Sequence, residues 1–233
     1  MSPTRTKLNA GSASPKTIDV LIVDDHPIVR KGLAQLISHE PDMNVCGDAE
    51  DVEQALTQVA KLHPDIVIVD LTLKKLSGLD LIRQLQNIQP DLATLVLSMH
   101  DESLYAERAL RAGARGYIMK QEGTDKLVTA IRTVLAGDIY VSERMAARML
   151  GKLVGGRSSE APGSVMDRLS DRELEVFELL GRGLSTRQVA ERLNVSVKTI
   201  ESHREHIKQK LQLRNANELI QHATQWVTAI GAD

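Results

Sequence analysis

The sequence is poor in cysteine and in aromatic side chains, and each shortage excludes a kind of function. Its 233 residues include one cysteine, Cys46, which excludes an intramolecular disulfide framework and a zinc site built from cysteines. Aromatic residues make up 2% of the chain, too few for a platform on which the bases of single-stranded nucleic acid stack. This composition suits a reducing compartment, and we expect the cytoplasm.

Long apolar runs and an excess of one charge are also missing. No apolar run approaches the ~18 residues that a membrane helix needs, so we expect no membrane partner. Residues 1–17 lack the apolar region of a signal peptide and are expected to form a disordered, solvated tail. Lys and Arg total 29 against 31 Asp and Glu, so the net charge of −2 does not indicate a nucleic-acid or membrane partner for the chain as a whole.

Short aliphatic runs alternate with helix-like periodicity in the first half of the chain. The runs cover residues 19–23, 43–46, 66–69, 94–97 and 116–119. Each is aliphatic on both faces, which is typical of a strand buried between two layers of helices. Five strand-then-helix repeats predict an α/β domain with a five-stranded parallel sheet, for which we expect the flavodoxin-like strand order 2-1-3-4-5.

The second half of the chain has a different pattern. Four helical periodicities without a strand signal follow Arg168, and they predict an all-α domain. Residues 142–154 favour a further amphipathic helix, and residues 151–165 are rich in Gly, Ser and Pro, as in a flexible connector. The predicted organisation is a tail over 1–17, a first domain over 18–138, a helix and linker over 139–165, and a second domain over 166–233.

Polar side chains follow four of the five predicted strands. Asp24 and Asp25 follow the first, Asp70 the third, Ser98 the fourth and Lys120 the fifth. Ligands of open parallel sheets bind outside the carboxyl ends of the strands, where the strand order reverses. A single aspartate after a strand is most often a turn former or a helix cap, but the combination at four strand ends favours a binding site.

Three carboxylates at one sheet edge predict a particular chemistry. They repel one another, and Mg²⁺ removes that repulsion while it also prefers carboxylate, water and phosphate oxygens. Asp70 is the expected nucleophile toward a phosphoryl group, with Mg²⁺ and Lys120 balancing the charge of the phosphoryl oxygens. His26 beside the acidic pair is interpreted as a helix-entry residue before Pro27, and Cys46 as a small core side chain.

The segments VLIVDDHPIVRKGL, DIVIVDLTLKKLSGLDLI, LVLSMHDE and ARGYIMK resemble the receiver domain of two-component response regulators, over about residues 18–138. The resemblance implies a CheY-like fold in which Asp70 is the phospho-acceptor. It implies that Asp25, Asp70 and the main-chain carbonyl of Thr72 hold Mg²⁺, helped by Asp24 through water.

The same resemblance assigns a switch and shows two departures. It implies that the hydroxyl of Ser98 turns toward the phosphoryl group and that the rotamer of Tyr117 follows this movement. Lys74 stands where many receivers have a proline, and Gln121 follows Lys120 where many others have one. Neither departure removes a reacting group.

The second domain contains a helix-turn-helix pattern. Ser185 is a candidate cap for a short helix, residues 194–196 form a tight turn, and Ser196 is a candidate cap for a longer helix over 197–211. Between Arg182 and Arg214 there are eight Lys and Arg against three Glu, a local charge of +5. Such a basic region in a nearly neutral chain is typical of a protein that binds the phosphates of DNA.

A helical wheel divides the residues of the longer helix. Ile200, Ile207 and Leu211 share the face that we expect to be buried. The opposite side chains, expected in the major groove, are Lys198, Glu201, Ser202, Glu205 and Gln209. The flanking side chains, expected to position the DNA backbone, are Thr199, His203, Arg204 and Lys208. An equally weighted alternative is that Glu201 pairs with Arg204, or Glu205 with Lys208, on the helix surface.

The run LSDRELEVFELLGRGLSTRQVAERLNVSVKTIESHREHIKQKL resembles the LuxR-type helix-turn-helix of NarL/FixJ-type regulators, over roughly residues 166–230. This resemblance implies a four-helix unit whose third helix reads DNA. The final helix carries Leu219, Ala223, Trp226 and Ile230 on one face, which suits either a dimer contact or ordinary core packing.

Together these patterns predict a regulator rather than an enzyme. The resemblance implies that a histidine kinase phosphorylates Asp70 and so controls binding of double-stranded promoter DNA by a homodimer. Phosphorylation would either favour dimerisation or release the second domain, and the sequence does not distinguish the two routes. One rival is an aspartate-nucleophile phosphohydrolase, which usually has a general acid two residues after the nucleophile; here that residue is Thr72. The other is a protein-interaction module that has lost DNA binding, against which the local charge of +5 argues.

Overall fold

The computed structural model describes residues 17–73, 76–154, 166 and 168–231. Residues 1–16 of the predicted tail, Lys74 and most of the predicted connector lie outside the described residues.

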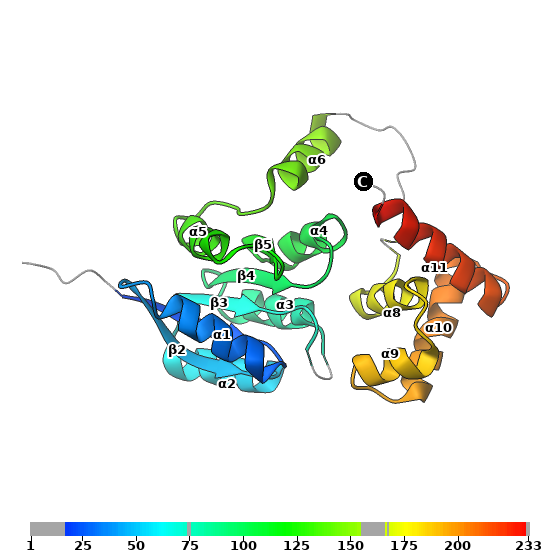
Figure 1. The fold of residues 1–233 in the computed structure, drawn as a ribbon, viewed down its shortest axis with the longest axis horizontal. Coiled ribbons are helices and arrows are strands. Elements are labelled where there is room, and N and C mark those ends of the chain that lie inside the picture. The colour runs from blue at the N-terminus through cyan, green and yellow to red at the C-terminus, as the bar shows by residue number, and fades with distance from the viewer. Residues whose placement is uncertain (1–16, 74–75, 155–165, 167, 232–233) are drawn as a thin grey trace, which may run out of the picture.

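The first domain is a parallel sheet with helices on both faces (Figure 1). Its strands are β1 (Ile18–Val23), β2 (Met43–Ala49), β3 (Ile66–Val69), β4 (Ala93–Ser98) and β5 (Gly116–Met119). Its helices are α1 (Pro27–Ile37), α2 (Val52–Leu62), α3 (Gly78–Ile88), α4 (Glu102–Ala112) and α5 (Thr124–Leu135). The strand order is β2-β1-β3-β4-β5, and all neighbours are parallel, which confirms the predicted fold class.

Alternating side chains of the strands supply two apolar layers. Val20 and Ile22 of β1 belong to the layer that contains the buried residues of α1 and α5. Leu21 and Val23 face the other layer, with the buried residues of α2, α3 and α4. Since successive side chains of a strand point to opposite faces, an aliphatic run such as DVLIV fills both layers at once.

The edge strand β2 is longer than its apolar pattern predicted. The sequence analysis ended it at Cys46, whereas the structure continues it to Ala49. Gly47 and Asp48 pair with Leu21 and Ile22 of β1, after a shift of register between Val20 and Leu21. A strand at the edge of a sheet is held by backbone pairing on one side and tolerates polar side chains, so periodicity alone does not mark its end.

The helices after the sheet are α6 (Glu143–Val154), α8 (Asp171–Gly181), α9 (Thr186–Arg192), α10 (Val197–Leu211) and α11 (Ala216–Gly231). Ser170 and Ser185 cap α8 and α9, each in a capping box with the third helical residue, and Ser196 caps α10. These hydroxyls accept backbone N–H groups that a helix start leaves unpaired. The last four form the predicted helical unit (Figure 1).

Helix α8 lies at the centre of the contacts of the second domain. It packs against α10 and α11, and the rings of Phe177 and Trp226 have their centroids 5.5 Å apart. All nine residues from Glu173 to Gly181 are buried. A helix that is buried on every side needs a partner on its polar face too, and one apolar cluster runs through both domains.

None of the helices in the described ranges combines the length and hydropathy of a membrane span.

Candidate functional site

Three carboxylates meet at the carboxyl edge of the sheet. Val23 and Val69, the last residues of β1 and β3, are register partners, so the chain places Asp24 and Asp70 side by side. The ligand atoms of Asp24, Asp25, His26 and Asp70 all lie within 4.8 Å of one another. Asp24 is 2% exposed and Asp70 4%, so these two charges are largely removed from water.

Lys120, which follows β5, reaches across the edge to two of these carboxylates. Its Nζ lies 2.7 Å from Oδ2 of Asp70 and 2.6 Å from Oδ2 of Asp24. Burial alone would lower the pKa of Lys120, but the charges and hydrogen bonds of Asp70 and Asp24 raise it above its ordinary value. Lys120 therefore stays protonated and supplies one positive charge to three acidic groups.

The acidic cluster retains an excess of negative charge. Burial raises the pKa of Asp70 to about 6, although the charge of Lys120 acts in the opposite direction, and the neighbouring Asp24 raises it further. A bound cation would offset both the cost of burying these negative charges and the repulsion between them. The donors are carboxylate oxygens at one open sheet edge, and this donor set fits a hard divalent ion such as Mg²⁺.

His26 has two roles at this edge. It is the N-cap of α1, followed by Pro27, as the sequence indicated. Its ring Nδ1 also lies 2.6 Å from Oδ1 of Asp25 and 3.2 Å from Oδ1 of Asp24, with the side chain 59% exposed. The sequence analysis missed this contact, for which the adjacency of the three residues in DDHP was the available signal.

The hydroxyl of Thr72 points away from the acidic cluster. Its Oγ1 lies 2.9 Å from Nε2 of His100 and donates to a carboxylate oxygen of Glu175 at 3.1 Å. Glu175 belongs to α8, in the second domain. The side chain of Thr72 therefore joins the two domains, while the role of its main-chain carbonyl toward a metal stays a prediction.

Ser98 and Tyr117 converge on the backbone of His100. Ser98, the last residue of β4, is fully buried, and its hydroxyl accepts the N–H of His100 at 3.3 Å. The hydroxyl of Tyr117 donates to the carbonyl of His100 at 2.9 Å. Burial raises the pKa of Tyr117 well above its usual value, so the phenol keeps its proton and acts as a donor.

The ring of His100 contacts two buried carboxylates of α8. Its Nδ1 lies 3.1 Å from Oε2 of Glu178, and its Nε2 lies 3.7 Å from Oε1 of Glu175. Glu178 also accepts the hydroxyl of Tyr105 at 2.9 Å. Burial alone would lower the pKa of His100, but the hydrogen bonds with Glu175 and Glu178 raise it to about 9.

A second polar contact joins the domains at the start of α8. Asp171 accepts Nη2 of Arg83 at 2.7 Å and Nη1 of Arg108 at 2.9 Å. Arg108 also donates to the carbonyls of Leu169 at 3.0 Å and Met166 at 2.6 Å. The sequence analysis predicted none of these contacts, because the partners lie far apart along the chain.

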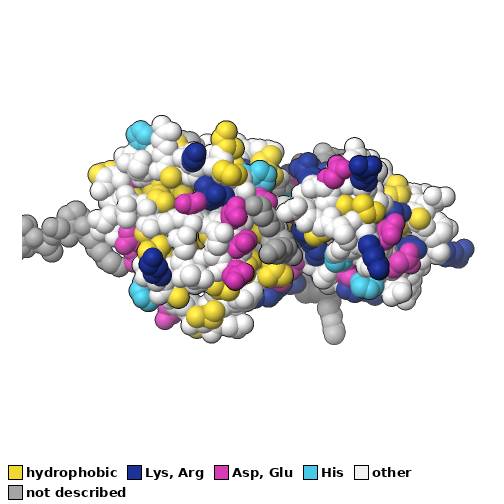
Figure 2. Space-filling model, turned by 90° about the horizontal axis from the view of Figure 1, so that it is seen from below, with side chains coloured by type: hydrophobic (Ala, Val, Ile, Leu, Met, Phe, Trp, Pro, Cys, Tyr) yellow, Lys and Arg dark blue, Asp and Glu magenta, His cyan; other side chains and the backbone are white. Residues whose placement is uncertain are grey.

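The side chains of α10 that are predicted to read DNA bases are exposed in the structure. Lys198, Glu201, Ser202 and Glu205 are exposed, and Ile200 and Ile207 on the opposite side are buried, as the helical wheel predicted. On the face of the second domain that Figure 2 shows, Lys and Arg side chains are mixed with Asp and Glu.

Three of the four predicted flanking residues of α10 have partners inside the protein, and the buried Nδ1 of the fourth, His203, has no hydrogen-bond partner among the described residues. Arg204 lies 2.5 Å from the hydroxyl of Thr186, and Lys208 pairs with Glu205 at 2.7 Å, which is one of the two helix-surface pairs considered above. The hydroxyl of Thr199 contacts the capping Ser196. His203 is half-buried, and burial followed by the charge of Arg172 lowers its pKa.

Comparison with known proteins agrees with this two-part arrangement. Residues 20–132 match the family described as response regulator receiver domain, and residues 167–223 match the family described as bacterial regulatory proteins, luxR family. The oxygen regulatory protein NreC of Staphylococcus carnosus is 36% identical over 207 residues, which cover 88% of this chain and 95% of that protein.

Solved structures give the same result. RcsB of Salmonella typhimurium matches with a TM-score of 0.62 and 27% identity, over 90% of this chain and 98% of that one. A LuxR-family two-component response regulator from Aurantimonas sp. SI85-9A1 matches with a TM-score of 0.56 and 35% identity, over 60% and 99%. RcsB of Salmonella enterica, in a structure described as bound to promoter rprA in the presence of phosphomimetic BeF₃⁻, matches with 28% identity and a TM-score of 0.58, over 90% and 99%. The chain therefore belongs to the two-component response regulators that join a receiver domain to a LuxR-type helix-turn-helix domain.

Proposed function

We propose that this response regulator is phosphorylated on Asp70 by a histidine kinase and that the phosphoryl group controls its binding to promoter DNA. The observation that carries the proposal is the position of Asp70, a buried carboxylate held beside Asp24 and 2.7 Å from the ammonium group of Lys120. An aspartate is a known nucleophile toward phosphorus, and a nucleophile needs a counter-charge for the oxygens of its product.

Each residue of the edge has a role in this reaction. A carboxylate oxygen of Asp70 forms the new bond to phosphorus while the bond from phosphorus to the kinase imidazole breaks, and the imidazole keeps that electron pair. Lys120 binds a phosphoryl oxygen and holds it against the product carboxylate. Asp24, Asp25, Asp70 and the main-chain carbonyl of Thr72 would hold Mg²⁺, which supplies further positive charge to the phosphoryl oxygens when bound.

The switch that we propose starts at Ser98. Its hydroxyl turns from the N–H of His100 toward a phosphoryl oxygen, and Tyr117, which bonds the carbonyl of the same residue, adjusts with it. The surface near Tyr117 repacks as a result, and it then favours a dimer or releases the second domain.

Double-stranded promoter DNA is the proposed partner of the second domain. The exposed side chains of α10 would read bases, namely Lys198, Glu201, Ser202, Glu205 and Gln209. The flanking side chains would position the phosphate backbone, namely Thr199, His203, Arg204 and Lys208. We infer a homodimer on two half-sites for the phosphorylated protein, in line with the RcsB relative, one structure of which is described as two dimers bound to two parallel DNAs.

We infer that the chain turns over no small-molecule substrate. The position two residues after Asp70, where a phosphohydrolase has its general acid, is Thr72, and its hydroxyl is bonded to His100 and Glu175. Thr72 is therefore not the general acid that a phosphohydrolase has at this position.

The test is intact-mass measurement after incubation with acetyl phosphate and Mg²⁺, followed by selection of duplex DNA with and without beryllofluoride. We expect the mass of one phosphoryl group to be added to the wild type and to the control Asp91→Asn, whose aspartate is exposed, and none to Asp70→Asn. We also expect beryllofluoride to increase the recovery of DNA by the wild type and by Asp91→Asn, and not by Asp70→Asn. Phosphorylation of Asp70→Asn, or DNA binding that does not respond to beryllofluoride, would contradict the proposal.

A further inference from the structure

We propose that Arg30 of α1 is a positioning residue for the metal-binding edge of the sheet, and that Asp48 of β2 holds it in place. Arg30 fixes the peptide group between Asp24 and Asp25, whose carboxylates are proposed ligands of Mg²⁺. The inference rests on the proposed function, since it concerns how the same edge binds its metal. It depends on two hydrogen bonds of one guanidinium group and on the register of β2.

The guanidinium group of Arg30 joins a strand to the acidic loop after β1. Its Nε donates to Oδ2 of Asp48 at 2.5 Å, and its Nη1 donates to the main-chain carbonyl of Asp24 at 2.6 Å. The side chain of Arg30 is 15% exposed and that of Asp48 is 55% exposed. Because the donors of a guanidinium group form a rigid planar fork, the carboxylate of Asp48 sets the direction from which Nη1 meets the carbonyl of Asp24.

The carbonyl of Asp24 belongs to the peptide group that joins the two acidic residues. This group is planar, so the bond from Arg30 fixes the plane from which the main chain enters Asp25. The residue Asp24 is held at two further atoms: its N–H donates to the carbonyl of Ala49 at 3.1 Å, and its Oδ1 accepts the N–H of His26 at 2.7 Å. Arg30 therefore extends a held strand end into the loop that carries the metal ligands.

Strand β2 has one residue more than β1 at the point where their register shifts. Val45 pairs with Val20, whereas Gly47 pairs with Leu21, so Cys46 is the additional residue. Successive side chains of a strand point to opposite faces. One additional residue therefore moves every later side chain of β2 to the opposite face of the sheet.

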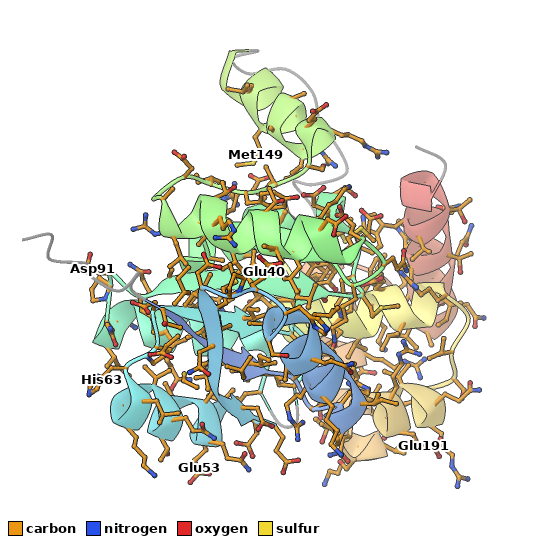
Figure 3. All side chains as sticks on the ribbon, turned by 60° about the vertical axis from the view of Figure 1, so that its left-hand side comes forward. Glu40, Glu53, His63, Asp91, Met149 and Glu191 are labelled. Carbon is orange, nitrogen blue, oxygen red and sulfur yellow. The ribbon has the colours of Figure 1, made fainter. Side chains whose placement is uncertain are left out.

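The shift places Asp48 on the face of the sheet that α1 covers. Asp48 pairs with Ile22, whose side chain lies in the apolar layer with the buried residues of α1. Helix α1 packs against β2 (Figures 1 and 3). In a continuous register Asp48 would pair with Val23 and face the layer of α2, α3 and α4, away from Arg30.

The value of the pair lies in its direction rather than in its strength. An ion pair with one partner more than half exposed contributes little to stability, because water screens it. Groups that hydrogen-bond to the ligands of a metal act by orienting them, and the loss of one usually weakens metal binding by a factor of about 10–100. We therefore expect the effect of Arg30 in the affinity for Mg²⁺.

Charge and position predict opposite effects for the removal of Arg30. The guanidinium group is a cation beside a site for a cation, so repulsion alone would let Mg²⁺ bind more tightly once the group is gone. Loss of its bond to the carbonyl of Asp24 instead lets the peptide group rotate, and the two carboxylates no longer converge, so Mg²⁺ binds more weakly. The sign of the change separates the two explanations.

The test compares the full-length wild type with Arg30→Met, which keeps a long apolar side chain, with Asp48→Ala, and with the double variant. Lys31→Met is the matched control for a lost cation, because Lys31 is exposed at the next position of α1. Glu53→Ala is the control for a lost carboxylate, because Glu53 is exposed on α2, as Figure 3 shows. The readouts are the affinity for Mg²⁺, by calorimetry, and the rate of phosphorylation by acetyl phosphate at increasing Mg²⁺, by intact mass.

We expect Arg30→Met to bind Mg²⁺ at least about tenfold more weakly than the wild type, and Asp48→Ala to show a smaller loss. The double variant should match Arg30→Met, since Asp48 acts through Arg30. The Mg²⁺ concentration for half-maximal phosphorylation should rise in step, while the rate at saturating Mg²⁺ should approach that of the wild type. General damage to the site would lower the saturated rate as well. Both controls should match the wild type.

Three results would overturn the inference. The first is unchanged or tighter Mg²⁺ binding by Arg30→Met, and the second is a double variant in which the two single losses add in full. If Arg30→Met does not fold, the third applies: equal Mg²⁺ affinities of Asp48→Ala and the control Glu53→Ala. Absence of Mg²⁺ binding by the wild type would instead contradict the proposed function itself.

Discussion

Gly78, the first residue of α3, lies directly against the main-chain carbonyl of Asp70. Its N–H donates to the carbonyl of Leu71 at 2.8 Å, so the start of α3 is fastened to the two residues that follow β3. A Cβ on Gly78 would overlap the carbonyl oxygen and carbon of Asp70 and the Cα of Leu71. The position of Asp70, the proposed phospho-acceptor, therefore depends on the absence of a Cβ at Gly78.

Gly78→Ala should displace the backbone of Asp70 and disrupt the site. We expect a loss of about 1–3 kcal/mol in the free energy of unfolding, as for other insertions into packed regions, together with at least a tenfold slower phosphorylation by acetyl phosphate. Urea denaturation and intact-mass kinetics measure the two effects.

Gly32→Ala is the matched control, because Gly32 lies within α1 and nothing surrounds the place of its Cβ. This substitution should stabilise α1 by up to about 1 kcal/mol and leave phosphorylation unchanged. Equal behaviour of the two alanine variants would show that the contact between Gly78 and Asp70 does not position the site.

Replacement of Lys120 should separate metal binding from phosphoryl chemistry. In Lys120→Gln the three carboxylates lose their buried counter-charge, so we expect Mg²⁺ to bind at least as tightly as in the wild type. Phosphorylation should slow by a factor of about 10²–10³, the usual effect of removing one group that stabilises developing negative charge.

Calorimetric titration of Mg²⁺ and intact-mass kinetics with acetyl phosphate test this expectation side by side. Lys126→Gln is the control: this lysine is exposed and pairs with Glu122 one turn earlier, so both measurements should match the wild type. Weaker Mg²⁺ binding in Lys120→Gln would show that the lysine organises the metal site rather than the phosphoryl group.

The raised pKa of Asp70 makes stability and metal binding depend on pH. Burial raises the pKa to about 6 from the ordinary value of 3.8, so the folded protein retains this proton over a range in which the unfolded chain has lost it. The corresponding stabilisation is complete below about pH 4 and is lost as the pH rises through about 6. Without Mg²⁺ at about pH 7, Asp70→Asn should therefore be more stable than the wild type, by about 1–3 kcal/mol.

Mg²⁺ should show the opposite pH dependence. The ion competes with the proton on Asp70, so its affinity should fall as the pH is lowered through about 6, with proton uptake by the buffer when the metal binds. Calorimetry in two buffers of different ionisation enthalpy measures the number of protons released. An affinity that is constant between about pH 5 and 7.5 would show that Asp70 does not ligate the metal.

The sequence predicted the sheet and the reacting edge because both follow from local patterns. Aliphatic runs mark buried strands, strand ends in an open parallel sheet share one edge, and the order of the strands makes β1 and β3 neighbours. Asp24, Asp70 and Lys120 come together for that reason alone. The serine caps of α9 and α10 were equally visible, since a cap is defined by its nearest neighbours.

The contact between the domains had no comparable signal. Glu175 and Glu178 are separated by three positions in a helix of apolar residues, a pattern that also fits a solvated face. Their burial depends on His100, Thr72 and Tyr105, more than 70 positions earlier in the chain. These pairs form only when the two domains dock, and the periodicity within either domain contains no information about how they dock.

The capping box of α8 provides a test of stability that is separate from phosphorylation. Glu173 accepts the N–H of Ser170 at 2.7 Å and the Nζ of Lys210 at 2.5 Å, and Nδ1 of His206 lies 3.8 Å from its other oxygen. Burial alone would raise the pKa of Glu173, but Lys210 and Ser170 lower it below its ordinary value. The ionised carboxylate therefore stabilises the fold at neutral pH, and this contribution is lost as the pH falls below about 4.5.

Glu173→Gln should lower the free energy of unfolding by about 1–2 kcal/mol at about pH 7. The difference from wild type should shrink as the pH falls below about 4.5 and through the lowered pKa of the native carboxylate, because acid then neutralises this group as well. Urea denaturation across that pH range, monitored by the fluorescence of Trp226, measures the effect. Trp226 of α11 packs against Phe177, which lies on α8 with Glu173. Glu191→Gln, on an exposed helix-surface pair, should change stability by less than about 0.5 kcal/mol. A destabilisation of Glu173→Gln that persists unchanged after acid has protonated the native carboxylate would mean that shape rather than charge at this cap supports the fold, because protonation removes the charge but not the shape.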